Sequence, residues 1–240
     1  MSTESFTSTP PAAPAAPPST APGAPAHATP LAHHFRDLHQ QHEVGTLGMW
    51  MFLATEVLFF GAVLSAFHIY RFKYGEAFIH ASMMLSTPLA AANTAVLLCS
   101  SLTMALAVRA ARIGQSRRVQ QAFIVATMIL GLAFLVIKGC EYGLDYHENL
   151  VPHYDFHPEK WPANLDARHG ELFFGFYFTL TGLHAVHMVV GLGVMAVLLY
   201  KAGQGRYTPQ HFTPVEAAGL YWHFVDVVWV FLFPMLYLIR

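Results

Sequence analysis

The sequence predicts an all-α integral membrane protein in which five transmembrane helices pack as a bundle. Hydrophobic residues make up 55% of the 240-residue chain, and only 11% of its residues are Asp, Glu, Lys or Arg. A soluble domain carries about 25% charged residues, so this chain cannot cover a water-facing surface. Five separate segments are also apolar over the roughly 20 residues that a bilayer-spanning helix needs. Because backbone amides in lipid must be satisfied within their own segment, these runs favour helices.

The five spans lie within a membrane domain that covers residues 44–240. Residues 1–43 differ from this domain, because the first thirty are rich in Pro and Ala and predict a disordered tail. A His-rich segment follows the tail, and it is either a solvated juxtamembrane stretch or a metal-binding one. We expect the helices at about residues 47–70, 88–108, 122–143, 172–200 and 217–239.

The distribution of charge predicts how the helices are oriented. Five crossings place the two termini on opposite sides of the membrane. Basic residues are more frequent on the amino-terminal side, where four arginines fall within residues 109–118, whereas the long loop 144–171 is acidic. Because cytoplasmic loops are enriched in Lys and Arg, we expect a cytoplasmic amino terminus and an outside carboxy terminus. The net charge of −1 gives no electrostatic reason to expect nucleic-acid binding.

Several ionisable residues fall inside the predicted spans, and four of them are candidates for a site within the membrane: Glu56, His184, His187 and Asp226. Glu56 and Asp226 each lie about nine residues from the inner end of their span, close to the middle of a ~30 Å hydrocarbon core. His184 and His187 are three residues apart and are expected on one helix face. We therefore expect a buried polar layer in which Glu56 and His187 form a hydrogen-bonded pair. Such residues act either as a protonatable site or as interhelical hydrogen bonds.

Towards the outer end of the third span, Lys138 and Glu141 are three residues apart, which predicts an ion pair. We predict no catalytic residue and no metal site on the chain. A haem bound between facing helices needs opposed histidines at matched depth, whereas His184 and His187 are one turn apart on the same helix. Copper and zinc sites need a local cluster of ligands, which the spans lack.

Several motifs resemble those of subunit III of the haem-copper terminal oxidases. The closing run YWHFVDVVWVFLF (221–233) resembles that family's last helix, and GMWMFLATEVLFFG (48–61) resembles its first conserved helix. The motifs NTAVLL, EY, TGLHAVHMVVG and EAA lie between them in the family's order, so the resemblance covers about residues 44–240. The closing run supplies a packing motif that either fixes the last helix against its neighbours or lies against a partner subunit. Its residues are Tyr221, Trp222, His223, Phe224, Asp226 and Trp229.

The resemblance implies a fold and a role. The family's longer form has seven helices, and this chain resembles the shorter bacterial form with five. Such a subunit packs on subunit I, neighbours other subunits including subunit II, and supports proton uptake and stability during oxygen reduction. The resemblance places haem and copper on the partner subunits and none on this chain, with phospholipid as a candidate ligand. Glu56 occupies the position of the family's carbodiimide-reactive carboxylate.

These implications favour a cytochrome c oxidase in a bacterial cytoplasmic membrane. Two alternatives keep the same fold: subunit III of a quinol oxidase, and an accessory subunit of a nitric-oxide reductase. A further alternative, from another class, is a free-standing proton-coupled carrier that uses Glu56 and Asp226. The lack of an evident inverted repeat counts against the carrier.

Overall fold

The structure is a computed structural model that describes residues 38–152, 161–205, 207 and 212–239, with side chains from residue 43 onward. All of these residues belong to one compact unit, Leu31–Arg240. The predicted disordered tail falls outside the described residues, and so does most of the His-rich segment. Part of the acidic loop, residues 153–160, also lies outside them.

The described residues form six α-helices and no β-strand, so the prediction of an all-α fold is confirmed. Five of the helices are long and apolar enough to cross a membrane, as predicted. The sixth, α2, was not predicted, because a search for spans of about 20 apolar residues passes over a ten-residue helix. The helices are α1 (Leu38–Lys73), α2 (Gly75–Met84), α3 (Thr87–Arg112), α4 (Arg117–His147), α5 (Ala167–Gly203) and α6 (Thr213–Tyr237).

The observed helices are mostly longer than the predicted spans. Helix α4 begins before and ends after residues 122–143, because hydropathy follows only the apolar stretch while the helix continues into its polar flanks. Helix α5 begins at Ala167, where Asp166 caps it by accepting a hydrogen bond from the Arg168 amide at 3.0 Å. This contact satisfies one of the amides that a helix start leaves unpaired.

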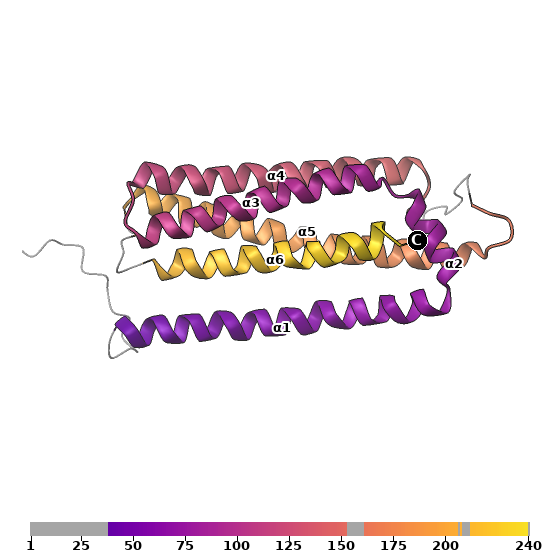
Figure 1. Cartoon of the computed structure of the whole chain (residues 1–240), viewed down its shortest axis with the longest axis horizontal. Coiled ribbons are helices and arrows are strands. Elements are labelled where there is room, and N and C mark those ends of the chain that lie inside the picture. Colours follow the sequence, from indigo (N-terminus) through magenta and orange to yellow (C-terminus); the bar gives the residue numbers. More distant parts are fainter. Residues whose placement is uncertain (1–37, 153–160, 206, 208–211, 240) are drawn as a thin grey trace, which may run out of the picture. The chain divides into compact units, whose positions relative to one another are not determined.

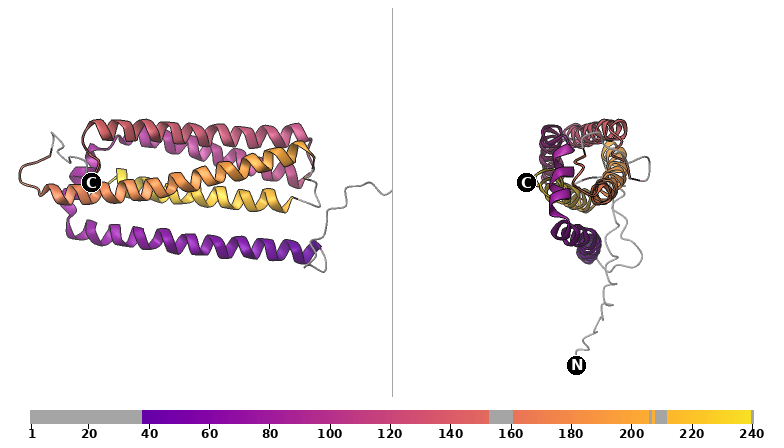
Figure 2. Two further views of the ribbon diagram at one scale, coloured as in Figure 1. Left: turned by 180° about the vertical axis from the view of Figure 1, so that it is seen from behind. Right: turned by 90° about the vertical axis from the view of Figure 1, so that its right-hand side faces the viewer.

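Helices α3, α4, α5 and α6 form a ring, and α1 lies outside it (Figures 1 and 2). Helix α1 contacts α5 and α6, and we call these contacts the seam. From residue 43 onward, the buried residues of α1 are Leu53, Phe60 and Phe67, and they recur every seven residues. This spacing gives a narrow apolar stripe, so α1 touches the ring along a line and leaves most of its surface exposed.

Helix α6 is the most enclosed helix of the ring, with twelve of its 25 residues buried against twelve of 37 in α5. Trp222 is fully buried and lies between the backbones of α4 and α5. A Cβ atom on Gly131 would come within 2.8 Å of the Trp222 ring, and one on Gly191 within 2.9 Å. The indole therefore fits only because both facing residues lack a side chain.

The short helix α2 covers the end of the bundle where α6 finishes (Figure 1). The last carbonyls of a helix have no partner within it. Ser82 of α2 donates a hydrogen bond to the Leu236 carbonyl at 2.8 Å, and Thr87 of α3 donates one to the Tyr237 carbonyl at 3.4 Å. Phe78 of α2 is fully buried and packs against the Phe67 ring, with centroids 5.5 Å apart.

Candidate functional site

Glu56 of α1 and His187 of α5 meet across the seam. Glu56 Oε2 lies 3.0 Å from His187 Nε2. The exposed fraction is 18% for the Glu56 side chain and 16% for His187, so the pair is partly enclosed rather than sealed. Tyr221 of α6 donates a hydrogen bond to the His187 carbonyl at 2.9 Å, and the pair therefore lies where α1, α5 and α6 come together.

The second ring nitrogen of His187 settles how many protons the pair holds. His187 Nδ1 lies 2.8 Å from the Leu183 carbonyl oxygen. Because a carbonyl oxygen only accepts hydrogen bonds, Nδ1 must carry the hydrogen. The contact with Glu56 then has two forms: a neutral acid that donates to a neutral imidazole, or an imidazolium that donates to a carboxylate. In both forms one proton lies between Glu56 and His187.

The two histidines predicted to share a face point to different neighbours. The His184 ring lies 5.4 Å from the Phe134 ring and 5.0 Å from Trp229, inside the ring of helices, whereas His187 faces α1. Residues three apart on a helix differ by about 60° in direction, and here that angle spans the boundary between core and seam. The two histidines therefore have different surroundings, and of the two it is His187 that contacts Glu56, as predicted.

Asp226 lies on the α3 side of α6. Its carboxylate is beside Ser101, but neither oxygen forms a hydrogen bond of good geometry with a described residue. Both ring nitrogens of His184 likewise have no such partner within the described chain. Asp226 and His184 are 3% and 1% exposed, so both are closed off from the surroundings of the bundle.

The remaining residues of the packing motif tie α6 to α3. Trp222 donates from its indole to the Ser100 hydroxyl at 3.0 Å, and Trp229 donates to the Thr94 hydroxyl at 3.0 Å. His223 Nδ1 lies 2.8 Å from the Ser101 hydroxyl. Both tryptophans are fully buried within the chain, which corrects the alternative that they lie against a partner subunit. Phe224 packs towards the seam, with its ring 6.5 Å from Phe60.

A second polar cluster lies within the ring near α2, and we call it the lysine network. As predicted, Lys138 forms an ion pair with Glu141, at 2.9 Å. Its other members are Tyr177 of α5, which donates to Asp145 at 3.0 Å, and Tyr237 of α6, which donates to Glu141 at 2.7 Å. Lys138 also donates to both tyrosines. The network thus joins α4, α5 and α6 with every member buried.

The sequence analysis missed three members of this network. Asp145 follows Lys138 and Glu141 at helical spacing, since residues 138, 141 and 145 share one face of α4, and this pattern could have revealed it. Tyr177 and Tyr237 come from other helices, and tyrosine is common near membrane interfaces. No local pattern in the sequence singles out these two.

The fold and the polar contacts define a five-span helical membrane protein with a partly enclosed carboxylate–imidazole pair. Within the described residues, no three His, Cys, Asp or Glu side chains gather as metal ligands. Residues 29–148 and 163–239 match the family model for cytochrome c oxidase subunit III. The chain therefore belongs to the cytochrome c oxidase subunit III family, as the motifs predicted.

Individual relatives agree with the family. The chain is 29% identical to the probable cytochrome c oxidase subunit 3 of Nocardia farcinica, over 92% of this chain and 99% of the relative. It is also 29% identical to the probable subunit 3 of Mycobacterium tuberculosis, over 81% and 88%. With cytochrome c oxidase subunit 3 of Oncorhynchus mykiss the identity is 32%, over 79% of this chain but 67% of the relative. The fuller match to bacterial relatives agrees with the shorter form.

Proposed function

We propose that this chain is subunit III of a bacterial cytochrome c oxidase, and that it packs on subunit I and supports proton uptake during oxygen reduction. Membership of the family implies that other oxidase subunits are its partners. In this proposal subunit II is also a neighbour, haem and copper reside on the partner subunits, and the chain contributes no redox centre or catalytic residue. We further propose a cytoplasmic amino terminus, which the arginines at residues 109–118 support.

The observation that carries the proposal is the contact between Glu56 and His187. Of the four residues predicted to form the polar layer, these two are the ones that surrounding molecules can reach. Transfer of the shared proton from Glu56 to His187 crosses one hydrogen bond and leaves the net charge of the pair unchanged. When a proton enters at the Glu56 side in the same step as another leaves from the His187 side, the pair relays a proton without holding a net charge in the bilayer.

Substitution of Glu56 in the whole oxidase complex tests this proposal. Glu56→Gln keeps the size of the side chain but removes the exchangeable carboxyl proton, so proton uptake per electron should fall while the initial rate of oxygen consumption is largely kept. His187→Asn should have the same effect, because it removes the acceptor. Glu76→Gln is the matched control, since Glu76 is an exposed glutamate on α2. Unchanged proton uptake in both seam variants would contradict a role in proton uptake.

The identity of the complex is tested by what purifies with the chain. Extraction in mild detergent should retain haem-bearing partner subunits, and the complex should oxidise reduced cytochrome c. Oxidation of quinol in its place would move the chain to a quinol oxidase. Purification without any haem protein would contradict membership of an oxidase complex.

A further inference from the structure

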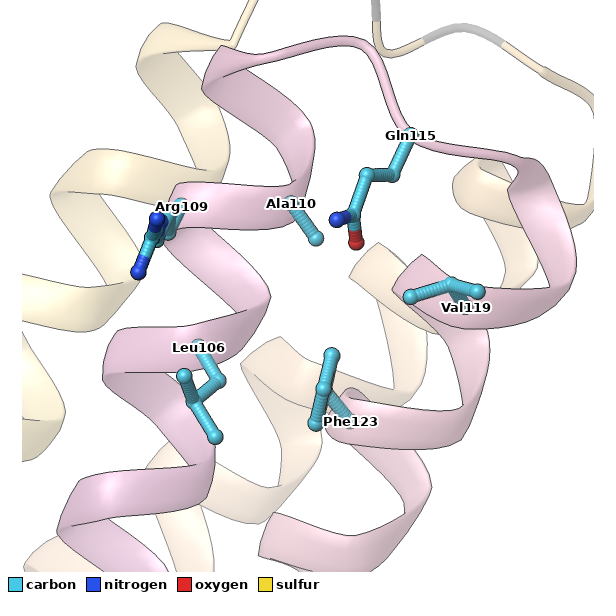
Figure 3. Close-up of a pocket in the computed structure, with 6 residues that line it drawn as sticks. All are labelled: Leu106, Arg109, Ala110, Gln115, Val119 and Phe123. Carbon is cyan, nitrogen blue, oxygen red and sulfur yellow. The ribbon is translucent and has the colours of Figure 1, made fainter.

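A pocket opens between α3 and α4 near the turn that joins them (Figure 3). This turn lies at the end of the bundle opposite α2 (Figure 1). Its volume is about 450 Å³. It lies outside the seam and the lysine network, so neither of the polar clusters described above uses it. The lining residues are Leu106, Arg109, Ala110, Gln115, Val119 and Phe123.

The polarity of the pocket changes with depth. Leu106 and Phe123 face each other across the deeper part, and the Gln115 amide reaches in from the turn above them (Figure 3). Leu106 lies one turn further into the membrane than Ala110, and Phe123 one turn further than Val119. The pocket is therefore apolar towards the middle of the bilayer and polar towards its surface.

The charged residues of the α3–α4 hairpin near the pocket are all basic. Residues 77–140 contain no Asp or Glu, whereas four arginines lie within residues 109–118. Arg112 is ion-paired with Glu216 at 2.8 Å, and the Arg117 guanidinium lies against the backbone at Gly205. Arg109, on the α3 rim, and Arg118 form no ion pair with a described residue.

We propose that this pocket binds an anionic phospholipid, with one acyl chain between Leu106 and Phe123 and the phosphate beside Gln115. The Arg109 side chain, which extends away from Gln115 in Figure 3, would turn towards the headgroup. The depth order of the lining matches that of a lipid, whose phosphate lies at the surface and whose chains lie below it. The positive hairpin matches the negative charge of the headgroup. The proposal does not depend on the oxidase assignment, because it uses only residues of this chain.

A free phosphate ion would use only part of this site. Leu106, Ala110, Val119 and Phe123 offer nothing to a small hydrated anion, whereas an acyl chain can make van der Waals contact with all four. A zwitterionic lipid would fill the apolar part but would gain less from the unpaired arginine. The expected preference is therefore for a lipid over phosphate, and for an anionic lipid over a zwitterionic one.

Photolabelling of the purified protein, with the subunits that accompany it, tests the proposal. The probe is phosphatidylglycerol with a photoactivatable acyl chain, present in trace amount in phosphatidylcholine vesicles, and labelled peptides are mapped by mass spectrometry. Labelling should concentrate on residues 102–123 and exceed that by the same probe built on phosphatidylcholine. Arg109→Gln should lower it roughly 5-fold, the loss expected for one basic residue near a membrane surface. Lys201→Gln, a charge loss at the same end of the bundle but outside the pocket, should leave it unchanged.

A second pair of variants separates filling of the pocket from a general disturbance of α4. Val119 is 36% exposed and lines the pocket, whereas Val125 is 37% exposed on the same helix and does not. Val119→Trp should abolish the labelling of residues 102–123, and Val125→Trp should preserve it. Equal labelling by the two lipid probes, undiminished labelling of Val119→Trp, or displacement of the probe by inorganic phosphate would each overturn the proposal.

Discussion

The ring of α3 to α6 and the seam between that ring and α1 hold their polar side chains in different ways. In the ring, the lysine network buries one ammonium group and two carboxyl groups, and each has partners on another helix. In the seam, Glu56 has a single described partner and keeps 18% of its side chain exposed. The comparison indicates that the ring uses polar groups to hold helices together, while the seam leaves a protonatable pair within reach of a neighbour.

The largest effect should come from removing the lysine of the network. Lys138→Met leaves Glu141 and Asp145 buried without a cation, so the free energy of unfolding should fall by about 3–5 kcal/mol. Equilibrium unfolding in mixed detergent micelles measures this loss. The double variant Lys138→Met with Glu141→Leu should regain more than half of it, because apolar residues replace a buried ion pair at little cost. If the loss in the double variant equalled the sum of the losses in Lys138→Met and in Glu141→Leu alone, the network would not be a coupled unit.

Packing around Trp222 should give the next largest effect. Gly191→Ala places a methyl group 2.9 Å from the indole, so the unfolding free energy should fall by about 1–3 kcal/mol. Gly193→Ala is the matched control, because a methyl group there meets nothing within 4 Å. That variant should be neutral or slightly stabilising, since alanine favours helix over glycine. Thermal unfolding of the two variants side by side checks the difference, and equal stability would mean that the indole yields easily.

Two tyrosines of α6, Tyr237 in the ring and Tyr221 at the seam, allow the two regions to be compared directly. Tyr237→Phe removes the hydrogen bonds to Glu141 and Lys138 and should cost about 1–2 kcal/mol. Tyr221→Phe removes one hydrogen bond, to the His187 carbonyl, and should cost about 0.6 kcal/mol. Unfolding in the same micelles ranks the two. The reverse order would place the stronger polar contact in the seam.

The smallest effect on stability should come from Glu56→Gln. The glutamine amide can still donate to His187 Nε2, so the free energy of unfolding should change by less than about 1 kcal/mol even though proton uptake falls. Measurement of both quantities on one preparation separates a functional role from a structural one. A loss of stability as large as that of Lys138→Met would show that the pair is a structural contact.

Apolar run length was enough to predict the five spans, because lipid imposes the same requirement on every segment that crosses it. Spacing along one helix was enough to predict the Lys138–Glu141 ion pair. A depth that placed His187 nearer than His184 to Glu56 was enough to suggest that Glu56 and His187 meet. The direction of each side chain around its helix was beyond these arguments. His184 and His187 differ by a modest rotation, yet they face different helices.

Contacts between distant helices also escaped the sequence analysis. Ser100 and Thr94 accept hydrogen bonds from the two indoles of α6, and Ser101 is hydrogen-bonded to His223. Small hydroxyl residues within an apolar run give no sign of which ones form such interhelical hydrogen bonds. Tyr177 and Tyr237 meet only because α5 and α6 come together in the fold. The α3–α4 pocket likewise depends on how two neighbouring helices diverge near their turn, which hydropathy does not report.

The indole of Trp222 restricts the movement of α6 by steric contact with the backbones of α4 and α5. Sliding α6 along its axis would drive the ring into the main chain of α4 or α5, so close packing opposes movement of α6 relative to these two helices. Helix α1 has no comparable wedge, since its contact follows one line of apolar side chains. Any displacement transmitted from a neighbouring protein should therefore tilt α1 and stretch the Glu56–His187 contact before it disturbs the ring.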